Sequence, residues 1–183
     1  MRPVLVVVGG LSATGKSTIA TALARRTSTP YLRVDRIEQA IVDWSALSHP
    51  LGPVGYAVAQ ALAREQLDLG LDLIVECVNP TAVTRDGWIA TAEAAGAALV
   101  EVEVICSDED EHRHRADTRT SDVEGLVKPV WKAIADREYE AWLRRPLVVD
   151  SATTSPDKAA RRIASMMASV RAEKVGNIGP WSS

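Results

Sequence analysis

The chain has 183 residues, of which 46% are hydrophobic and 25% are charged, and its formal net charge is −3. This length and composition predict one globular domain. The net charge gives no footprint for duplex nucleic acid, and only a local basic patch stays open. No apolar run approaches the roughly 20 residues that a membrane-spanning helix needs, so no membrane association is expected. The N-terminus lacks the pattern of a signal peptide, and we therefore expect a cytoplasmic protein.

The first predicted element is an uncharged apolar strand over residues 4–8. It leads directly into the sequence GLSATGKST, which fits the phosphate-binding pattern G-x-x-x-x-G-K-[ST], and a helix is predicted over residues 16–26. A strand, a glycine-rich turn and a helix together point backbone N–H groups and the positive end of a helix at one anion. The residues predicted to bind the nucleotide are Gly10, Ser12, Ala13, Thr14, Gly15, Lys16, Ser17 and Thr18.

Two residues of this loop carry specific chemistry. Lys16 is expected to reach the β- and γ-phosphates of a nucleoside triphosphate. The Ser17 hydroxyl is expected to occupy one coordination position of Mg²⁺. The loop therefore predicts a site for a nucleoside triphosphate with its magnesium ion.

Strands and helices alternate along the rest of the chain. Further strands are predicted at residues 31–34, 71–78, 98–106 and 146–150, and further helices at 36–47, 54–69, 85–95, 108–118, 129–142 and 157–171. This alternation predicts an α/β fold in which helices cover both faces of a parallel sheet. We expect a single domain over residues 1–171 with a helical lid at about 107–128, followed by a flexible tail over 172–183.

Two acidic residues lie where strands are predicted to end, and ligands bind beyond the carboxyl ends of the strands in an open parallel sheet. Asp35 follows the second strand, where a carboxylate can orient an attacking hydroxyl or simply cap the next helix. Glu76 ends an otherwise apolar run. It can belong to the Mg²⁺ shell, contact the substrate, act as a base, or be bonded by loop N–H groups.

Five further residues are candidates for the site. Arg115 and Arg119 lie four positions apart, so they share one helix face and can either clamp phosphates or form ion pairs in solvent. Asn79 and Arg85 follow the third predicted strand and are candidate substrate contacts, although Asn-Pro is also an ordinary turn signal. Trp44, on the helix after Asp35, either contacts the substrate or packs against the helices.

Taken together, these motifs resemble small P-loop kinases of the AAA-family ATPase/kinase-like group, and in particular the chloramphenicol phosphotransferase-like and zeta-toxin-like kinases. The resemblance rests on the phosphate loop, on V-D-x-I-E over residues 34–38, on E-C-V-N-P over 76–80 and on the two arginines at 115 and 119. It implies a P-loop NTPase three-layer sandwich with a five-stranded parallel sheet in the order 2-3-1-4-5. It also implies ATP as the donor, Mg²⁺ as the ion and Asp35 as the base for an acceptor hydroxyl. Glu76 departs from the Asp that such kinases often carry.

We therefore expect an ATP-dependent phosphotransferase that moves the γ-phosphate to a hydroxyl of a small molecule. The predicted catalytic residues are Lys16, Asp35, Arg115 and Arg119, the predicted metal site is Ser17 with Asp35 or Glu76, and the predicted acceptor contacts are Asp35, Trp44, Glu76, Asn79 and Arg85. Two other functions stay open, namely a nucleotide or polynucleotide-end kinase and a nucleotide-dependent switch or ATPase. The sequence does not name the acceptor, the oligomeric state or the preference for ATP over GTP.

Overall fold

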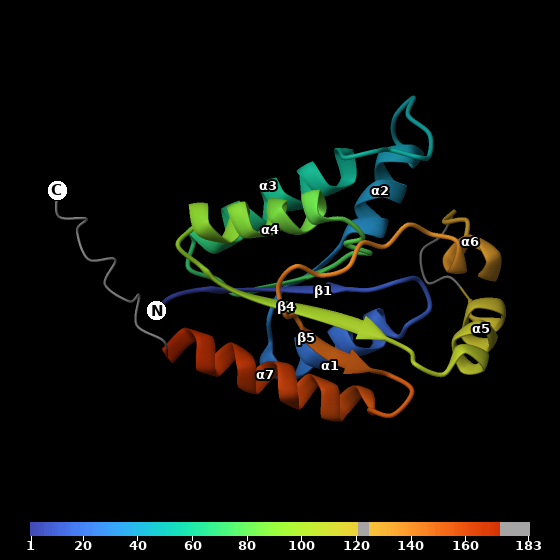
Figure 1. The fold of residues 1–183 in the computed structure, drawn as a ribbon. Helices are drawn as coiled ribbons and strands as arrows, with labels where there is room; N and C mark the ends of the chain where they lie inside the picture. The colour runs from blue at the N-terminus through green and yellow to red at the C-terminus, as the bar shows by residue number, and fades with distance from the viewer. Residues whose placement is uncertain (121–124, 173–183) are drawn as a thin grey trace, which may run out of the picture.

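A computed structural model of the chain describes residues 1–120 and 125–172. Residues 121–124 of the predicted lid and residues 173–183 of the predicted tail lie outside this range. The strands are β1 (Val4–Gly9), β2 (Tyr31–Arg33), β3 (Leu73–Glu76), β4 (Ala98–Ile105) and β5 (Leu147–Asp150). They form one parallel sheet in the order β2-β3-β1-β4-β5, so the predicted strand order is confirmed (Figure 1).

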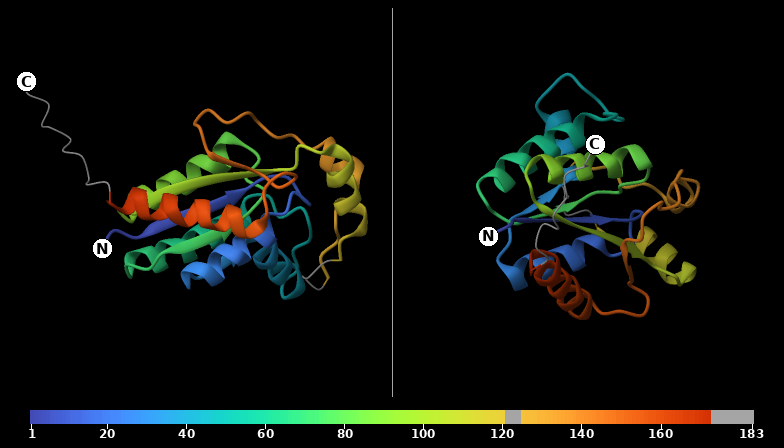
Figure 2. Two further views of the ribbon diagram at one scale, coloured as in Figure 1. Left: turned by 90° about the horizontal axis from the view of Figure 1, so that it is seen from below. Right: turned by 60° about the vertical axis from the view of Figure 1, so that its left-hand side comes forward.

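Helices cover both faces of this sheet. They are α1 (Lys16–Thr27), α2 (Val34–Asp43), α3 (Val54–Asp68), α4 (Ala82–Ala94), α5 (Glu109–Thr118), α6 (Trp131–Ala135) and α7 (Pro156–Ala172). Helices α1 and α7 lie side by side on one face, whereas α3 and α4 cover the other (Figures 1 and 2). Helices α5 and α6 lie beyond the carboxyl ends of the strands (Figure 1). Within the described part of the chain, no helix is long and apolar enough to cross a membrane.

The central strand β1 is buried on both faces, as its uncharged sequence predicts. Residues 4–8 are each 0% exposed. Val6 belongs to a core cluster with Leu23 of α1 and Ile163 of α7, whereas its neighbour Val7 belongs to a second cluster with Trp88 of α4. Because successive side chains of a strand point to opposite faces, one short strand anchors both cores and fixes where the phosphate loop begins.

Among the element boundaries that differ from the prediction, three bear on the site. Strand β2 ends at Arg33, and Asp35 already lies in the first turn of α2, where an acidic side chain favours the helix. Helix α2 then ends at Asp43 rather than at residue 47. The helix predicted over 129–142 is limited to residues 131–135. The chain after it is held to the α4 side of the molecule by a buried arginine, as described below.

Candidate active site

The loop between β1 and α1 requires glycine at two positions. Gly10 has φ 137° and Gly15 has φ 93°, which is a backbone region that residues with a side chain rarely adopt. A Cβ atom on Gly10 would lie 2.2 Å from the carbonyl oxygen of Val104. The hydroxyl of Thr14 donates a 2.9 Å hydrogen bond to the carbonyl of Leu11, which closes the loop on itself.

The start of α1 has the properties of an anion site. Gly15 stands at the N-cap without a side-chain cap, and the first turn contains no acidic residue, so the N-terminal N–H groups of the helix lack a side-chain acceptor. The Nζ atom of Lys16 is buried beside them and donates a 2.6 Å hydrogen bond to the carbonyl of Leu11. Burial lowers the pKa of Lys16, and the nearby Glu76 carboxylate opposes this shift. A phosphate group would satisfy both the N–H groups and the buried ammonium.

Glu76 lies at the centre of a hydrogen-bonded cluster next to this lysine. It is 5% exposed, and its Oε1 atom accepts a 2.6 Å hydrogen bond from the hydroxyl of Ser17. Its Oε2 atom accepts a hydrogen bond from Tyr31 and lies 3.4 Å from Nε of Arg33, the residue paired with Glu76 in the parallel register. Burial and the charge of Glu76 raise the pKa of Tyr31 well above its usual range, so the phenol stays protonated and donates.

Two of the three predicted metal residues are in direct contact. Ser17 and Glu76 offer a hydroxyl and a carboxylate oxygen, the kind of ligand that Mg²⁺ uses together with phosphate oxygens. The third residue, Asp35, is separated from Glu76 by Arg33, whose guanidinium contacts both carboxylates and lies 2.9 Å from Asp35. Asp35 also accepts a 2.8 Å hydrogen bond from the backbone N–H of Arg36. The structure therefore separates a hydroxyl–carboxylate pair at the loop from a second carboxylate further out.

The charge of Arg119 acts on both parts of the site. Its side chain is half-buried, and burial lowers its pKa, while the charge of Asp35 opposes this shift. The charge of Arg119 in turn contributes to lowering the pKa of Lys16. No carboxylate of the described residues lies within ion-pair distance of its guanidinium, and its Nε atom is buried without a hydrogen-bond partner among them. Its charge is therefore available for an anion placed between Lys16 and Asp35.

Arg115 points to a different part of the site. Its guanidinium donates a 2.9 Å hydrogen bond to the hydroxyl of Ser151, in the loop between β5 and α7, and forms an ion pair with Glu111. Beside it is a cavity of about 250 Å³, which adjoins the phosphate loop at Gly15. The cavity is lined by Gly15, Thr18, Ile19, Arg115, Ser151, Thr154 and Pro156.

The position of Arg85 does not support the predicted substrate contact. The side chain is 2% exposed, and its guanidinium donates to backbone carbonyls, including those of Asn79 (3.1 Å), Ala141 (3.0 Å) and Glu140 (2.7 Å). It also lies over the ring of Trp142 at 4.2 Å from the centroid. Arg85 therefore holds the segment after α6 against the loop after β3, which is why the predicted helix does not continue there.

Two more predicted substrate contacts are not supported by their positions. Trp44 follows the last residue of α2 and is 90% exposed, so it forms no wall of a site. Asn79 is 0% exposed with φ 54°, and its Cβ would be 3.2 Å from a Cβ placed on Gly9. Its amide is thus covered by the end of β1 and does not reach an open surface.

Three residues of the site were missed in the sequence. Tyr31 and Arg33 alternate on a strand that ends at the site, so the period of two could have placed both on the Glu76 side. His112 lies on α5 with its Nε2 atom 2.8 Å from the carbonyl oxygen of Ser12. No local pattern identifies His112, because this contact joins residues that are 100 positions apart.

Comparisons with known proteins agree with this fold. The family model of the AAA domain AAA_33 matches residues 5–139. A Chloroflexus aurantiacus structure matches with a TM-score of 0.72, 19% identity and coverage of 92% of this chain and 98% of that chain. A gluconokinase from Sinorhizobium meliloti matches with a TM-score of 0.62, 20% identity and coverage of 92% and 94%.

The APS kinase CysC of Mycobacterium tuberculosis, solved in complex with AMPPNP and APS, matches with a TM-score of 0.63 and 18% identity over 91% of this chain and 98% of that chain. Comparison with curated protein sequences gives no match. At these identities, the likeness to solved structures establishes a kinase-like P-loop fold and leaves the substrate open.

Proposed function

Because the chain belongs to the AAA_33 family of AAA domains, we propose that it is an ATP-dependent phosphotransferase that moves the γ-phosphate to a hydroxyl of a small molecule. The observation that carries this proposal is the order in which charged side chains follow one another along the carboxyl edge of the sheet. Lys16 and the Ser17–Glu76 pair lie at the loop, Asp35 lies beyond Arg33, and the charge of Arg119 acts on both parts. This is the order that a donor phosphate followed by an acceptor hydroxyl needs.

The donor half of the site consists of the loop amides, Lys16 and the cavity beside Arg115. The loop amides and the lysine would bind the phosphates. The cavity adjoins the loop at Gly15, and the planar guanidinium of Arg115 can stack on a base. Among the described residues that line this cavity none carries a carboxylate, which is the acceptor that suits the N–H donors of guanine best. This supports ATP over GTP.

The oxygen ligands of Ser17 and Glu76 fit Mg²⁺, which would be held by the serine hydroxyl, the glutamate and phosphate oxygens. When bound, the ion would offset phosphate charge. Tyr31 and Arg33 keep Glu76 in place from the side opposite Ser17, because both contact its Oε2 atom. The position of this carboxylate therefore does not depend on the bound nucleotide.

The acceptor half of the site is built around Asp35. Its carboxylate would accept the proton of the attacking hydroxyl, and Arg33 fixes one of its oxygens at 2.9 Å. Arg119 would stabilise negative charge on the phosphate during transfer, since its guanidinium has no carboxylate partner among the described residues. The likeness to a gluconokinase and an APS kinase supports a small-molecule acceptor.

A transfer screen tests this proposal. The protein is incubated with ATP, Mg²⁺ and individual hydroxyl compounds, and ADP and phosphorylated products are measured by mass spectrometry, with Lys16→Ala as the matched inactive variant. We expect ATP to raise the melting temperature of the wild type but not of Lys16→Ala, and at least one compound to be phosphorylated. Equal stabilisation of both proteins would contradict the nucleotide site. ADP formation at the same rate with every compound and with none, without any phosphorylated product, would contradict the transferase.

A further inference from the structure

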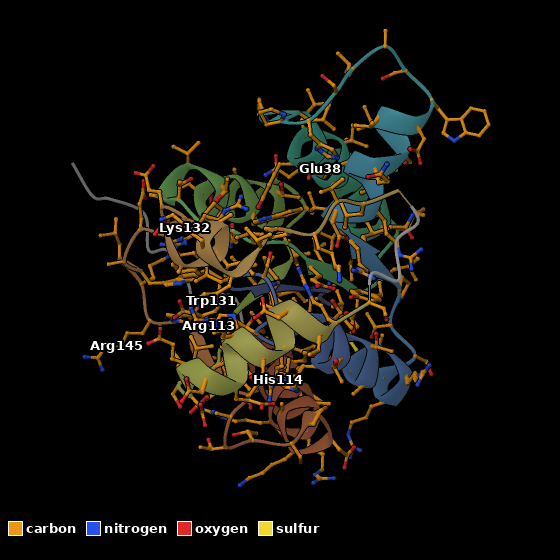
Figure 3. All side chains as sticks on the ribbon, turned by 90° about the vertical axis from the view of Figure 1, so that its right-hand side faces the viewer. Glu38, Arg113, His114, Trp131, Lys132 and Arg145 are labelled. Carbon is orange, nitrogen blue, oxygen red and sulfur yellow. The ribbon has the colours of Figure 1, made fainter. Side chains whose placement is uncertain are left out.

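The lid helix α5 is joined to the phosphate loop by a buried histidine. His112 is 7% exposed, and its Nε2 atom lies 2.8 Å from the carbonyl oxygen of Ser12. A carbonyl oxygen only accepts, so Nε2 must carry the proton and donate. The other side of the ring packs edge-on against Trp131 of α6, with centroids 5.0 Å apart and an interplanar angle of 81°. Figure 3 shows this end of the molecule, with Trp131 next to α5.

This hydrogen bond fixes the orientation of one peptide unit. In a trans peptide, the C=O and the following N–H point in opposite directions. Since the carbonyl of Ser12 points at the His112 ring of α5, the N–H of Ala13 points away from that ring. An N–H group of the loop with this orientation can donate a hydrogen bond to a phosphate oxygen.

The same peptide unit is under conformational strain. Ala13 has φ 66°, in the left-handed region, although it carries a side chain, whereas Gly10 and Gly15 have positive φ values without that penalty. Rotation of the Ser12–Ala13 peptide about its two ends would return Ala13 to negative φ. It would also turn the N–H outwards. The hydrogen bond from His112 opposes this rotation, because it would lose its acceptor.

We propose that His112 is a positioning residue of the nucleotide site, which holds the Ser12–Ala13 peptide so that the Ala13 N–H can bind a phosphate. This inference rests on the proposed function, since it presumes that the loop binds ATP. It also means that the position of α5 and the affinity of the loop for phosphate are coupled.

Four substitutions separate the hydrogen bond from simple packing. His112→Phe keeps a ring against Trp131 but removes the donor, whereas His112→Gln keeps an N–H donor at a similar reach. His114→Phe is the matched control, because His114 is exposed on the same helix and is labelled in Figure 3. His112→Leu removes the donor with a smaller side chain, should the phenylalanine variant not fold. Calorimetry measures the affinity of each protein for ATP and for adenosine, which lacks phosphates.

We expect His112→Phe to bind ATP about tenfold more weakly, because the phosphate would lose its hydrogen bond from the Ala13 N–H. We expect this variant to bind adenosine as the wild type does. His112→Gln should recover most of the ATP affinity, and His114→Phe should equal the wild type. Unchanged ATP affinity in His112→Phe would overturn the inference. So would an equal loss for ATP and adenosine, which indicates general damage to the fold. A wild type that binds no ATP would instead contradict the proposed function itself.

Discussion

The hydroxyl of Ser17 donates a 2.6 Å hydrogen bond to Oε1 of Glu76, and this contact joins the first turn of α1 to the last residue of β3. The two residues are 59 positions apart in the sequence. They meet because β1 and β3 are parallel neighbours, so the loop after β1 and the end of β3 lie at the same edge of the sheet. The other carboxylate oxygen accepts from Tyr31. Glu76 is therefore fixed from two sides before any nucleotide binds.

The first prediction concerns this glutamate. Glu76→Gln should reduce Mg²⁺-dependent ATP turnover by roughly 10- to 100-fold, because the amide loses the charge that an ion and its ligands require. The affinity for ATP in the presence of EDTA should change little. Steady-state kinetics and calorimetry measure these effects, with Glu93→Gln, an exposed residue of α4, as the control. Turnover within twofold of the wild type would show that Glu76 has no part in the metal site.

The second prediction concerns the buried charge of Lys16. Burial lowers its pKa, so the ammonium destabilises the folded protein at neutral pH, and this cost decreases as the pH rises towards the ordinary pKa of lysine. Without nucleotide, Lys16→Met should melt at a higher temperature than the wild type near pH 7, and the difference should narrow near pH 10. Added ATP should stabilise only the wild type. Thermal melts across this pH range provide the test. A lower melting temperature for Lys16→Met at pH 7 would refute this account.

The third prediction separates structure from catalysis at Arg85. Arg85→Ala should lower the free energy of unfolding by about 3 kcal/mol, because several buried carbonyls lose their donor. The KM for ATP should stay the same in the folded protein. Urea denaturation measures the loss, with Arg64→Ala as a control from an exposed ion pair. An unchanged stability together with a raised KM for the acceptor would restore the substrate role.

Much of the fold could be predicted because its signals are local. Residues 4–8 are apolar throughout, as a strand buried on both faces requires, and the loop glycines occupy backbone conformations that exclude other residues. The order of the strands was implied by the family resemblance and is confirmed. The Ser17–Glu76 contact also agrees with the sequence analysis, which placed Ser17 in the phosphate loop and Glu76 at the end of a strand.

What could not be predicted depends on contacts between distant residues. The segment after α6 has a helical pattern, yet Arg85 takes the carbonyls of Glu140 and Ala141, which a helix would use for its own hydrogen bonds. From the sequence alone, Arg85 also looks like a residue that contacts a ligand, because the sequence does not show that its side chain is buried. His112 gives no sign in the sequence that it reaches the carbonyl of Ser12.

The fourth prediction separates Arg115 of α5 from Arg119, which follows the last residue of that helix. Arg115 contacts Ser151 beside the cavity, so Arg115→Ala should raise the KM for ATP about tenfold and leave kcat within about threefold. The charge of Arg119 acts on both Lys16 and Asp35, so Arg119→Ala should lower kcat about 100-fold with a smaller change in KM. Initial rates at varied ATP concentrations measure both. The reverse pattern would show that the two roles are exchanged.

The central claim is that Asp35 serves the acceptor and the phosphate loop serves the donor. In Asp35→Asn, the carboxylate that would accept the hydroxyl proton is lost, whereas the loop, Lys16 and the Ser17–Glu76 pair are unchanged. Asp136→Asn, an exposed residue after α6, is the control. This comparison requires an acceptor found in the transfer screen.

The most direct measurement is the rate of phosphate transfer from ATP to that acceptor, together with the dissociation constant for ATP, in the wild type, Asp35→Asn and Asp136→Asn. We expect Asp35→Asn to transfer phosphate at least about 100-fold more slowly while binding ATP within twofold of the wild type. We expect Asp136→Asn to equal the wild type in both quantities. Transfer by Asp35→Asn at the rate of the wild type would contradict the proposed division of the site.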